Sequence, residues 1–371
     1  MTKRGKGEGS IYQRGDKRWS AQITLPSGKR QTYYGKTRKE VVARLDEAKA
    51  LLKRGLPLPS ERQTVADYMR GWLASVTTIR ATTKARYAQD VERIARAFPT
   101  TPLVRLSAQQ VQTFYGKLAE GLSSTTVHHT HAVLHRALSD ALRMDLVSQN
   151  VADKVDAPRR DHHEMTTLGE EQGRILLEMA KESRYQALFV LALATGMRRG
   201  ELLALKWQDV DLDKGVLSVR ASVQILDGAP DRLIIAETKT AHSRRQVSLG
   251  KRVIDALRAH KAAQKAERFH VGPGVWVEHD LVFPGYRGGI LDPQRPGKTL
   301  NQLLRAANLP PMRFHDLRHT AISLMLARGV QPHTVAKLVG DDVGLMLRVY
   351  AHVSPNQEKE AAAVMDAVFG G

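Results

Sequence analysis

The stretch TGMRRGE, residues 195–201, follows the apolar run 187–194 and encloses two arginines between two glycines. A helix is predicted over 185–195, and it leads into a sharp turn at Gly196. Glycines on both sides of an arginine pair at a helix junction can expose a guanidinium while its backbone stays fixed. Alone this signal is weak, because pairs of arginines at protein surfaces are common.

Three further clusters lie downstream of this turn. ETKT, residues 237–240, sets a lysine in a tight turn between predicted strands. HDLRH, residues 315–319, opens a predicted helix, and its first histidine and its arginine are three apart and share a face. VYAHV, residues 349–353, carries a tyrosine near the C-terminus. Each cluster alone also fits an ordinary structural role in a turn, a helix cap or a packed helix.

HDLRH also fits the His-Asp/Glu-x-x-His pattern of zinc proteases. Arg318 would then share the neighbourhood of the cation, and Asp316 stands where those enzymes use glutamate. We therefore expect no metal here. The chain has no cysteine, which excludes disulfides, thiolate nucleophiles and cysteine-ligated zinc.

Taken together, the clusters supply two arginines, a lysine, a histidine and a tyrosine, which are the groups that metal-free phosphodiester transfer needs. Arginines bind non-bridging phosphate oxygens and stabilise the charge that develops on phosphorus. A tyrosine hydroxyl can form a covalent phosphoester, and lysine or histidine can move protons.

The order Arg…Lys…His-x-x-Arg…Tyr, within TGMRRGEL and HDLRH, resembles the tyrosine site-specific recombinases of the phage-integrase type. The resemblance covers essentially the whole chain and implies a multidomain fold. Residues 1–55 would form an arm-type DNA-binding domain with a small β-sheet and a helix, and 62–158 an all-α core-binding domain. Residues 164–371 would form the mixed α+β catalytic domain.

The resemblance also assigns roles by matched motif. Tyr350 is expected to attack the scissile phosphate and leave a 3′-phosphotyrosine. Arg198 and Arg318 would clamp the phosphate. Lys239 would protonate the leaving 5′ oxygen, and His315 would help to deprotonate the tyrosine.

Other positions of the motifs are less straightforward. Glu201 matches a family acid that would support the arginine, and Arg199 is out of register with the motif arginine. In LVGD, residues 338–341, Asp341 stands where the family usually has a histidine or a tryptophan that donates to phosphate. An ionised aspartate there offers no donor, so it either turns away, is protonated, or weakens the site. His333 is a poor substitute, because it lies eight residues earlier.

Net charge points independently to a polyanionic partner. The 371 residues hold 57 Lys and Arg against 38 Asp and Glu, a formal net charge of +19. Residues 1–60 alone hold 15 against 5, a net charge of +10. Double-stranded DNA is the expected partner, and a basic solubilising tail is the alternative. Hydrophobic residues make up 42% of the chain and charged residues 26%, as is ordinary for a globular protein.

The N-terminal segment is predicted to hold three short strands within 9–35, then a helix from a capping box at Thr37 and Glu40 to about Arg54. Aromatic and basic side chains alternate in this segment, as in sheets that contact a DNA groove. Trp19 and some of the tyrosines are expected to be core instead. The candidate DNA contacts are Tyr12, Arg14, Lys17, Arg18, Lys29, Arg30 and Tyr33, with Lys84 and Arg86 in the next segment.

The remaining chain reads as helices with a few strands. Helices are predicted over 65–73, 82–98, 108–119, 124–144, 170–180, 185–195, 252–266, 300–307, 315–327, 333–339 and 345–352. Strands are predicted over 216–225, 233–236 and 245–249.

The resemblance implies an integrase that inserts or excises a mobile element such as a phage, without a cofactor. Its partners would be core-type and arm-type DNA sites, a homotetramer on DNA, and host DNA-bending or directionality factors. An apolar stripe within 363–368 would dock on a neighbouring protomer or fold back. No signal peptide or membrane span is recognised, so we expect a cytoplasmic protein on the nucleoid.

Three alternatives stay open. A resolvase acting on chromosome dimers would lack the basic N-terminal domain, and a type IB topoisomerase would have another domain plan. The third is a DNA-binding protein that keeps the fold but is catalytically weak or silent.

Overall fold

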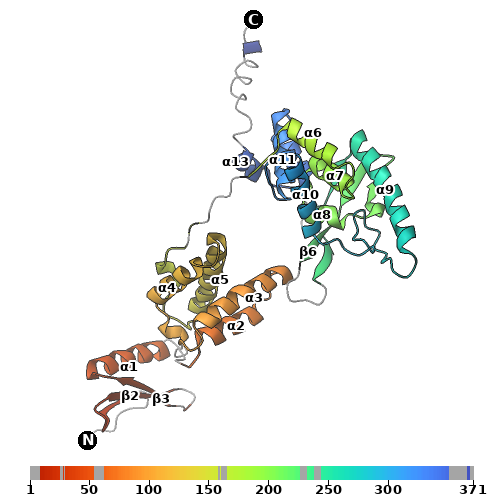
Figure 1. Cartoon of the computed structure of the whole chain (residues 1–371). Coiled ribbons are helices and arrows are strands. Elements are labelled where there is room, and N and C mark those ends of the chain that lie inside the picture. Colours follow the sequence, from red (N-terminus) through yellow and green to blue (C-terminus); the bar gives the residue numbers. More distant parts are fainter. Residues whose placement is uncertain are drawn as a thin grey trace. The chain divides into compact units, whose positions relative to one another are not determined.

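The computed structural model describes residues 9–25, 28, 30–53, 62–157, 159, 165–225, 232–237, 244–350 and 366–367. The chain divides into two compact units, Met1–His162 and His163–Gly371. The predicted classes of structure are all observed: a small sheet with a helix, a helical middle region and a mixed C-terminal region (Figure 1).

The N-terminal region is an antiparallel sheet in the order β1-β2-β3, packed against one helix. Ala21 and Ile23 of the central strand meet Val41 and Leu45 of the helix in a buried cluster, as the helical spacing of the apolar residues predicts. Glu40 N–H donates to Thr37 Oγ1, as the predicted capping box requires. The Glu40 carboxylate, however, accepts from the backbone N–H of Lys36, the residue before Thr37. The elements are β1 (Ser10–Gln13), β2 (Trp19–Thr24), β3 (Arg30–Gly35) and α1 (Arg38–Lys53).

The middle region is helical, as predicted, and its apolar faces enclose one core. Buried polar groups tie its helices together: Tyr68 O–H donates to Ala137 O at 2.6 Å and Thr130 Oγ1 to Asp90 Oδ1 at 2.7 Å. Such bonds keep buried polar atoms satisfied. The elements are α2 (Val65–Ser75), α3 (Ala81–Ala97), η1 (Leu103–Arg105), α4 (Ala108–Ala119), α5 (Ser124–Arg143) and η2 (Val151–Lys154).

The C-terminal region surrounds α7, whose apolar residues are buried almost all round. Its helices are α6 (Glu170–Met179), α7 (Gln186–Thr195), α8 (Arg199–Ala204), η3 (Trp207–Asp209), α9 (Lys251–Val271), α10 (Gln294–Ala306), α11 (Asp316–Ala327), α12 (Pro332–Val339) and α13 (Val343–Tyr350). Its strands are β4 (Val210–Asp211), β5 (Val216–Val219), β6 (Ala221–Ile225), β7 (Leu233–Glu237) and β8 (Arg245–Ser248).

The predicted single strand over 216–225 is wrong, because the structure has two strands there. β5 pairs with β4 and β8 in one antiparallel sheet, while β6 pairs with β7 in another. The strands separate at Arg220, which pairs with Asp209 at 3.0 Å. The buried residues Leu217, Val219 and Val223 are all at odd positions, so the alternation of buried and more exposed residues continues unchanged past Arg220. The hydrophobic pattern therefore does not reveal that one strand ends there and another begins.

The helix predicted over 300–307 begins six residues earlier, at Gln294. Pro293 and Pro296 make this segment look non-helical in the sequence. Both prolines lie in or just before the first turn, where the backbone N–H that proline lacks has no partner within the helix. Within the described residues, no helix is long and apolar enough to cross a membrane.

Two glycines in helices should respond oppositely to alanine. A Cβ on Gly71 of α2 meets nothing within 4 Å, whereas a Cβ on Gly200 of α8 would lie 2.4 Å from Ser222 Oγ and 2.8 Å from Val223 O. Gly71→Ala should raise the free energy of unfolding by about 0.5–1 kcal/mol. Gly200→Ala should lower it by about 1–3 kcal/mol, because α8 must move away from β6. Denaturant titration measures both, and equal effects would contradict the close packing of α8.

Candidate active site

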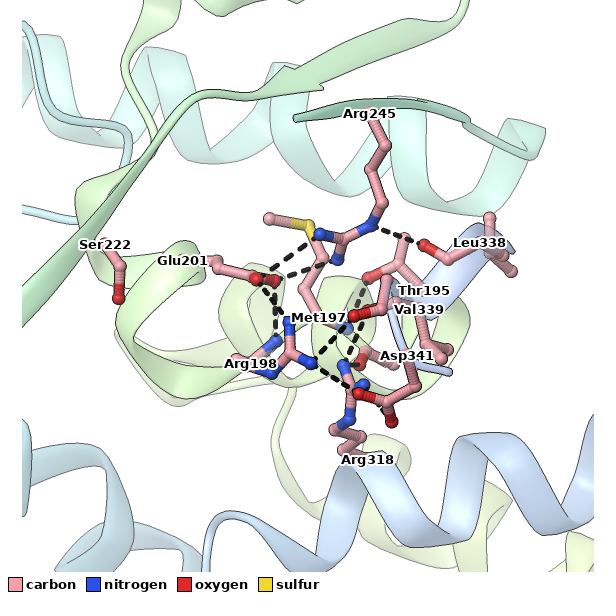
Figure 2. Close-up of polar contacts among 12 residues, drawn as sticks. Thr195, Met197, Arg198, Glu201, Ser222, Arg245, Arg318, Leu338, Val339 and Asp341 are labelled. Carbon is pink, nitrogen blue, oxygen red and sulfur yellow. Dashed lines mark hydrogen bonds and ion pairs between the residues drawn. The ribbon is translucent and has the colours of Figure 1, made fainter. Parts of the chain in front are cut away.

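Arg198 is fixed by the turn between α7 and α8. α7 ends at Gly196, whose φ of 61° is left-handed, and a Cβ there would lie 2.9 Å from Val339 Cγ1. Glycine is therefore required both by conformation and by the close approach of α12. The chain turns through Met197, and Arg198 stands immediately before α8 (Figure 2).

Glu201 holds the Arg198 side chain in place. Its carboxylate accepts the Arg198 backbone N–H at 3.0 Å and the Arg198 Nη1 at 3.0 Å. It is also bound by Arg245, whose Nη2 lies 2.8 Å from Glu201 Oε2. Burial acts to raise the pKa of Glu201, but the hydrogen bonds and charge of Arg245, with those of Arg198, outweigh it and leave the pKa lowered. Glu201 is thus an ionised anchor.

Arg245 is the residue of this network that sequence reasoning missed. It begins β8, its side chain is 6% exposed, and its Nε donates to Leu338 O at 2.6 Å. It therefore connects β8 to Glu201 and to the end of α12 (Figure 2). The signal was present in RQVSL, residues 245–249, because the arginine shares the inward face of the strand with two apolar residues.

Arg318 comes from the first turn of α11 and is 4% exposed. Its Nη1 donates to Gly196 O at 2.7 Å and to Val339 O at 2.9 Å. These carbonyls belong to the C-terminal ends of α7 and α12, where unpaired acceptors and the negative end of the helix dipole favour a cation. Burial lowers the pKa of Arg318 from its ordinary value, and the nearby Asp341 opposes that effect.

Asp341 faces the two arginines and does not turn away. α12 ends at Gly340, with a φ of 72°, and the chain then reverses so that Asp341 points back into the cluster. Its Oδ1 contacts Arg198 Nη2, and its Oδ2 lies 2.5 Å from Arg318 Nη2. Of the three possibilities left open by the sequence, displacement of the side chain from the arginines is therefore wrong for this structure (Figure 2).

His315 stands directly before α11, one turn from Arg318, and its ring meets that of His319 edge-on at 5.1 Å between centroids. Partial burial of the ring, with His319 and Arg318 adding to it, lowers the pKa of His315. The imidazole is therefore held neutral and able to accept a proton near neutral pH. Asp316, which lies between His315 and His319 in the sequence, is buried, and its carboxylate accepts hydrogen bonds from Arg313.

Tyr350 is the last residue of α13, and its side chain lies outside what the structure describes. The helix itself is anchored through Met346, which is buried in a small apolar cluster with residues of α11 and α12, including Ile322 and Val339. Lys239 lies outside the described residues, in the segment that joins β7 to β8. The C-terminal stripe within 363–368 lies mostly outside them too.

No group of three or more His, Asp or Glu side chains in the described part of the chain could hold a metal ion. The arrangement of Arg198, Arg318 and His315 instead offers guanidinium donors and a neutral base.

The candidate DNA contacts of the N-terminal sheet lie on both of its faces. The register sets Tyr12 and Tyr34 opposite Ser20, on the face away from α1, and both are exposed. Arg14 stacks over the Tyr34 ring at 5.5 Å. Tyr33 is opposite Ala21 and packs against the core, so the structure places it on the covered face.

The other basic candidates have varied surroundings. Arg18 pairs with Asp16 at 2.7 Å, Lys17 occupies the β1–β2 turn with a φ of 63°, and Arg30 opens β3 on the exposed face. Lys29 lies outside the described residues.

In the helical region, Lys84 is occupied locally, because its Nζ donates to Ala74 O at 3.2 Å at the end of α2. Arg86 is exposed and lines a hollow with Tyr87 and His129.

Two curated relatives match this chain over nearly its whole length. A tyrosine recombinase XerC-like protein of Caldanaerobacter subterraneus subsp. tengcongensis is 29% identical and covers 92% of each chain. An integrase of Streptomyces ambofaciens is 29% identical over 99% of this chain and 98% of its own.

Two solved structures share the fold. The integrase of transposon Tn1549, in complex with a circular intermediate DNA, matches with a TM-score of 0.69 and 18% identity over 81% of this chain and 99% of its own. A lambda integrase tetramer bound to a Holliday junction matches with a TM-score of 0.58 and 17% identity over 90% of this chain and 95% of its own.

The family model of the phage integrase family matches residues 166–357, more than half of the chain, and includes every element that carries Arg198, Arg318 and Asp341. The resemblance deduced from the motifs is thereby confirmed. The chain belongs to the phage integrase family of tyrosine recombinases and contains its catalytic domain.

Proposed function

We propose that this protein is a site-specific DNA recombinase that cleaves and rejoins DNA through a 3′-phosphotyrosine intermediate, and so integrates or excises a mobile element. The observation that carries the proposal is the convergence of Arg198 and Arg318 on a single anionic group. Two guanidiniums held in this way fit the two non-bridging oxygens of a phosphodiester.

In the proposed reaction the arginine pair binds the scissile phosphate and stabilises the charge of the pentacoordinate transition state. The Tyr350 hydroxyl attacks phosphorus while its proton passes to His315, whose lowered pKa keeps it neutral beforehand. The bond to the 5′ oxygen breaks, and Lys239 gives that oxygen a proton. Attack by a 5′ hydroxyl on the phosphotyrosine reverses these steps and rejoins a strand.

The proposed partner is double-stranded DNA, bound at core-type sites by residues 62–158 and 164–371 and at arm-type sites by residues 1–55. The net charge of +10 in residues 1–60 supports the last assignment. A homotetramer on DNA and host DNA-bending or directionality factors belong to the same proposal, since one related integrase has been solved as a tetramer on a Holliday junction.

One observation favours a second candidate, a recombinase fold that binds DNA without cleaving it. The Asp341 carboxylate already pairs with both arginines in the structure, so it occupies the position that a phosphate would take. Incubation with cognate DNA distinguishes the two, because only the active enzyme gives a protein–DNA complex that survives denaturing gel electrophoresis.

Tyr350→Phe should abolish the covalent complex and leave DNA binding unchanged, because only the nucleophilic oxygen is removed. Gel shift measures binding, and denaturing electrophoresis measures the adduct. The matched control is Tyr286→Phe, at an exposed tyrosine of the same region, which should cleave normally. A covalent adduct in the Tyr350 variant would identify another nucleophile.

Arg198→Ala and Arg318→Ala should each slow formation of the covalent complex by about 10²–10³-fold, since each removes a charged donor from the transition state. Arg199→Ala is the control, because this neighbouring guanidinium points elsewhere and donates to Pro293 O. Single-turnover rates on cognate DNA provide the comparison. Rates within a few fold of wild type would exclude the phosphate clamp.

Cleavage should tolerate mild acidity. Because its surroundings lower the pKa of His315 below the ordinary value of about 6.5, the base stays unprotonated until the pH falls below that value. Single-turnover rates at limiting DNA should therefore be level from about pH 7.5 to about 6.5 and decline only at lower pH. His315→Gln should lose this decline together with most activity, whereas His333→Gln should keep both. An acid limb centred above pH 7 would contradict the assignment.

A further inference from the structure

The carboxylate of Asp341 occupies the point where the two arginines converge. It gives one oxygen to each guanidinium, Oδ1 to Arg198 Nη2 and Oδ2 to Arg318 Nη2. A phosphodiester would present its two non-bridging oxygens to the same pair of donors. Figure 2 shows the carboxylate between the two guanidinium groups.

The arginines are held in place by other groups. Arg198 is bound to Glu201 and, through Nη2, to Gly340 O at 2.8 Å. Arg318 Nη1 is bound to two backbone carbonyls. Removal of the Asp341 carboxylate would therefore leave both guanidiniums oriented for another anion, which is the condition for a preorganised site.

The contact between Arg318 and Asp341 is also incomplete. Arg318 Nη2 is buried and, although it lies 2.5 Å from Oδ2, it makes no hydrogen bond of acceptable geometry within the described residues. The ion pair supplies charge compensation, but the N–H groups of this nitrogen have no well-oriented acceptor within the described residues. An unsatisfied buried donor is costly, so an anion with better-placed oxygens would be favoured there.

We propose that Asp341 is an internal substitute for the scissile phosphate, which pairs with Arg198 and Arg318 in the DNA-free protein and must be displaced before cleavage. The inference rests on the proposed function of the arginine pair as the phosphate clamp. Binding of DNA is then an exchange of one anion for another, and the apparent affinity of the clamp for phosphate is reduced by the fraction of molecules in which Asp341 is displaced.

The first test uses inorganic phosphate as the probe and the full-length protein. Asp341→Asn keeps the shape of the side chain and removes its charge, and Asp341→Ala removes the competitor entirely. If the displaced form makes up about 10% or less of the wild-type population, as is usual for a minor state, both variants should bind phosphate at least about tenfold more tightly. Isothermal titration calorimetry measures the affinity.

Asp342→Asn is the matched control. It removes the same charge one residue away, from an exposed position whose backbone carbonyl accepts from Met346 at the start of α13. Phosphate affinity of this variant should equal that of wild type. A gain in Asp342→Asn as large as in Asp341→Asn would overturn the proposal, because it would reflect net charge alone.

Thermal unfolding gives an independent readout. Without the carboxylate, the buried guanidinium of Arg318 and the partly exposed one of Arg198 lose a compensating charge, so both Asp341 variants should melt at a lower temperature than wild type in phosphate-free buffer. Added phosphate should stabilise the variants more than wild type, because it binds them more tightly. Equal stabilisation of wild type and variants by phosphate would contradict the exchange.

The second test measures covalent trapping on DNA that carries the cognate core site. The Asp341→Asn variant should form the phosphotyrosine complex faster than wild type at limiting DNA. If phosphate binding tightens in Asp341→Asn but neither protein forms the complex, competition between the Asp341 carboxylate and phosphate is supported, while the recombinase function, and with it displacement before cleavage, fails. If the complex forms while phosphate affinity and trapping rate are unchanged or reduced in Asp341→Asn, the inference is wrong and the function stands.

Discussion

Guanidinium groups that are buried or partly buried need a complete set of partners, and this requirement organises the C-terminal region. Glu201 pairs with Arg198 and Arg245, while Arg318 Nη1 donates to the carbonyls that end α7 and α12. Removing one partner of the buried Glu201–Arg245 pair would leave an uncompensated charge in a medium of low polarity, at a cost of about 3–5 kcal/mol. The turns at Gly196 and Gly340 place those carbonyls, and the carbonyls in turn orient the Arg318 side chain.

The candidate reacting groups are carried by elements that pack in two different hydrophobic clusters. Arg198 follows α7, which is surrounded by the main core, whereas α13 is held by the small cluster around Met346. The arginine pair is therefore part of a rigid scaffold, while Met346 is the one described residue of α13 that joins the small cluster. Such a division allows the arginine pair to be preformed while the helix that carries Tyr350 is positioned separately. Asp341 lies in the connection between α12 and α13, two residues before α13 begins.

The charged groups of the N-terminal segment and those around Arg198 and Arg318 have different surroundings. The N-terminal sheet covers its inner face with α1 and leaves Tyr12 and Tyr34 exposed, with Arg14 stacked on one ring. Residues 1–60 hold more than half of the excess charge of the chain, and exposed charges act over a range set by salt. Around Arg198 and Arg318 the charges are fewer, buried or partly buried, and paired, so each has a specific geometric role.

Local patterns in the sequence determined the elements and the reactive residue types. Helical periodicity predicted most helices, and the motifs around Arg198 and Arg318 predicted the family, because spacing and capping are encoded within a few neighbouring residues. Tertiary structure alone decided the rest. Arg245 enters the site from a strand, Asp341 turns inward to both arginines, and the pattern over 216–225 divides between two sheets. The local pattern set Arg245 on the inward face of its strand, but its partner Glu201 is 44 residues away, and Arg198 and Asp341 are 143 residues apart. Which of these groups meet, and which strands pair, therefore depends on the tertiary structure, because a local pattern does not specify contacts over such separations.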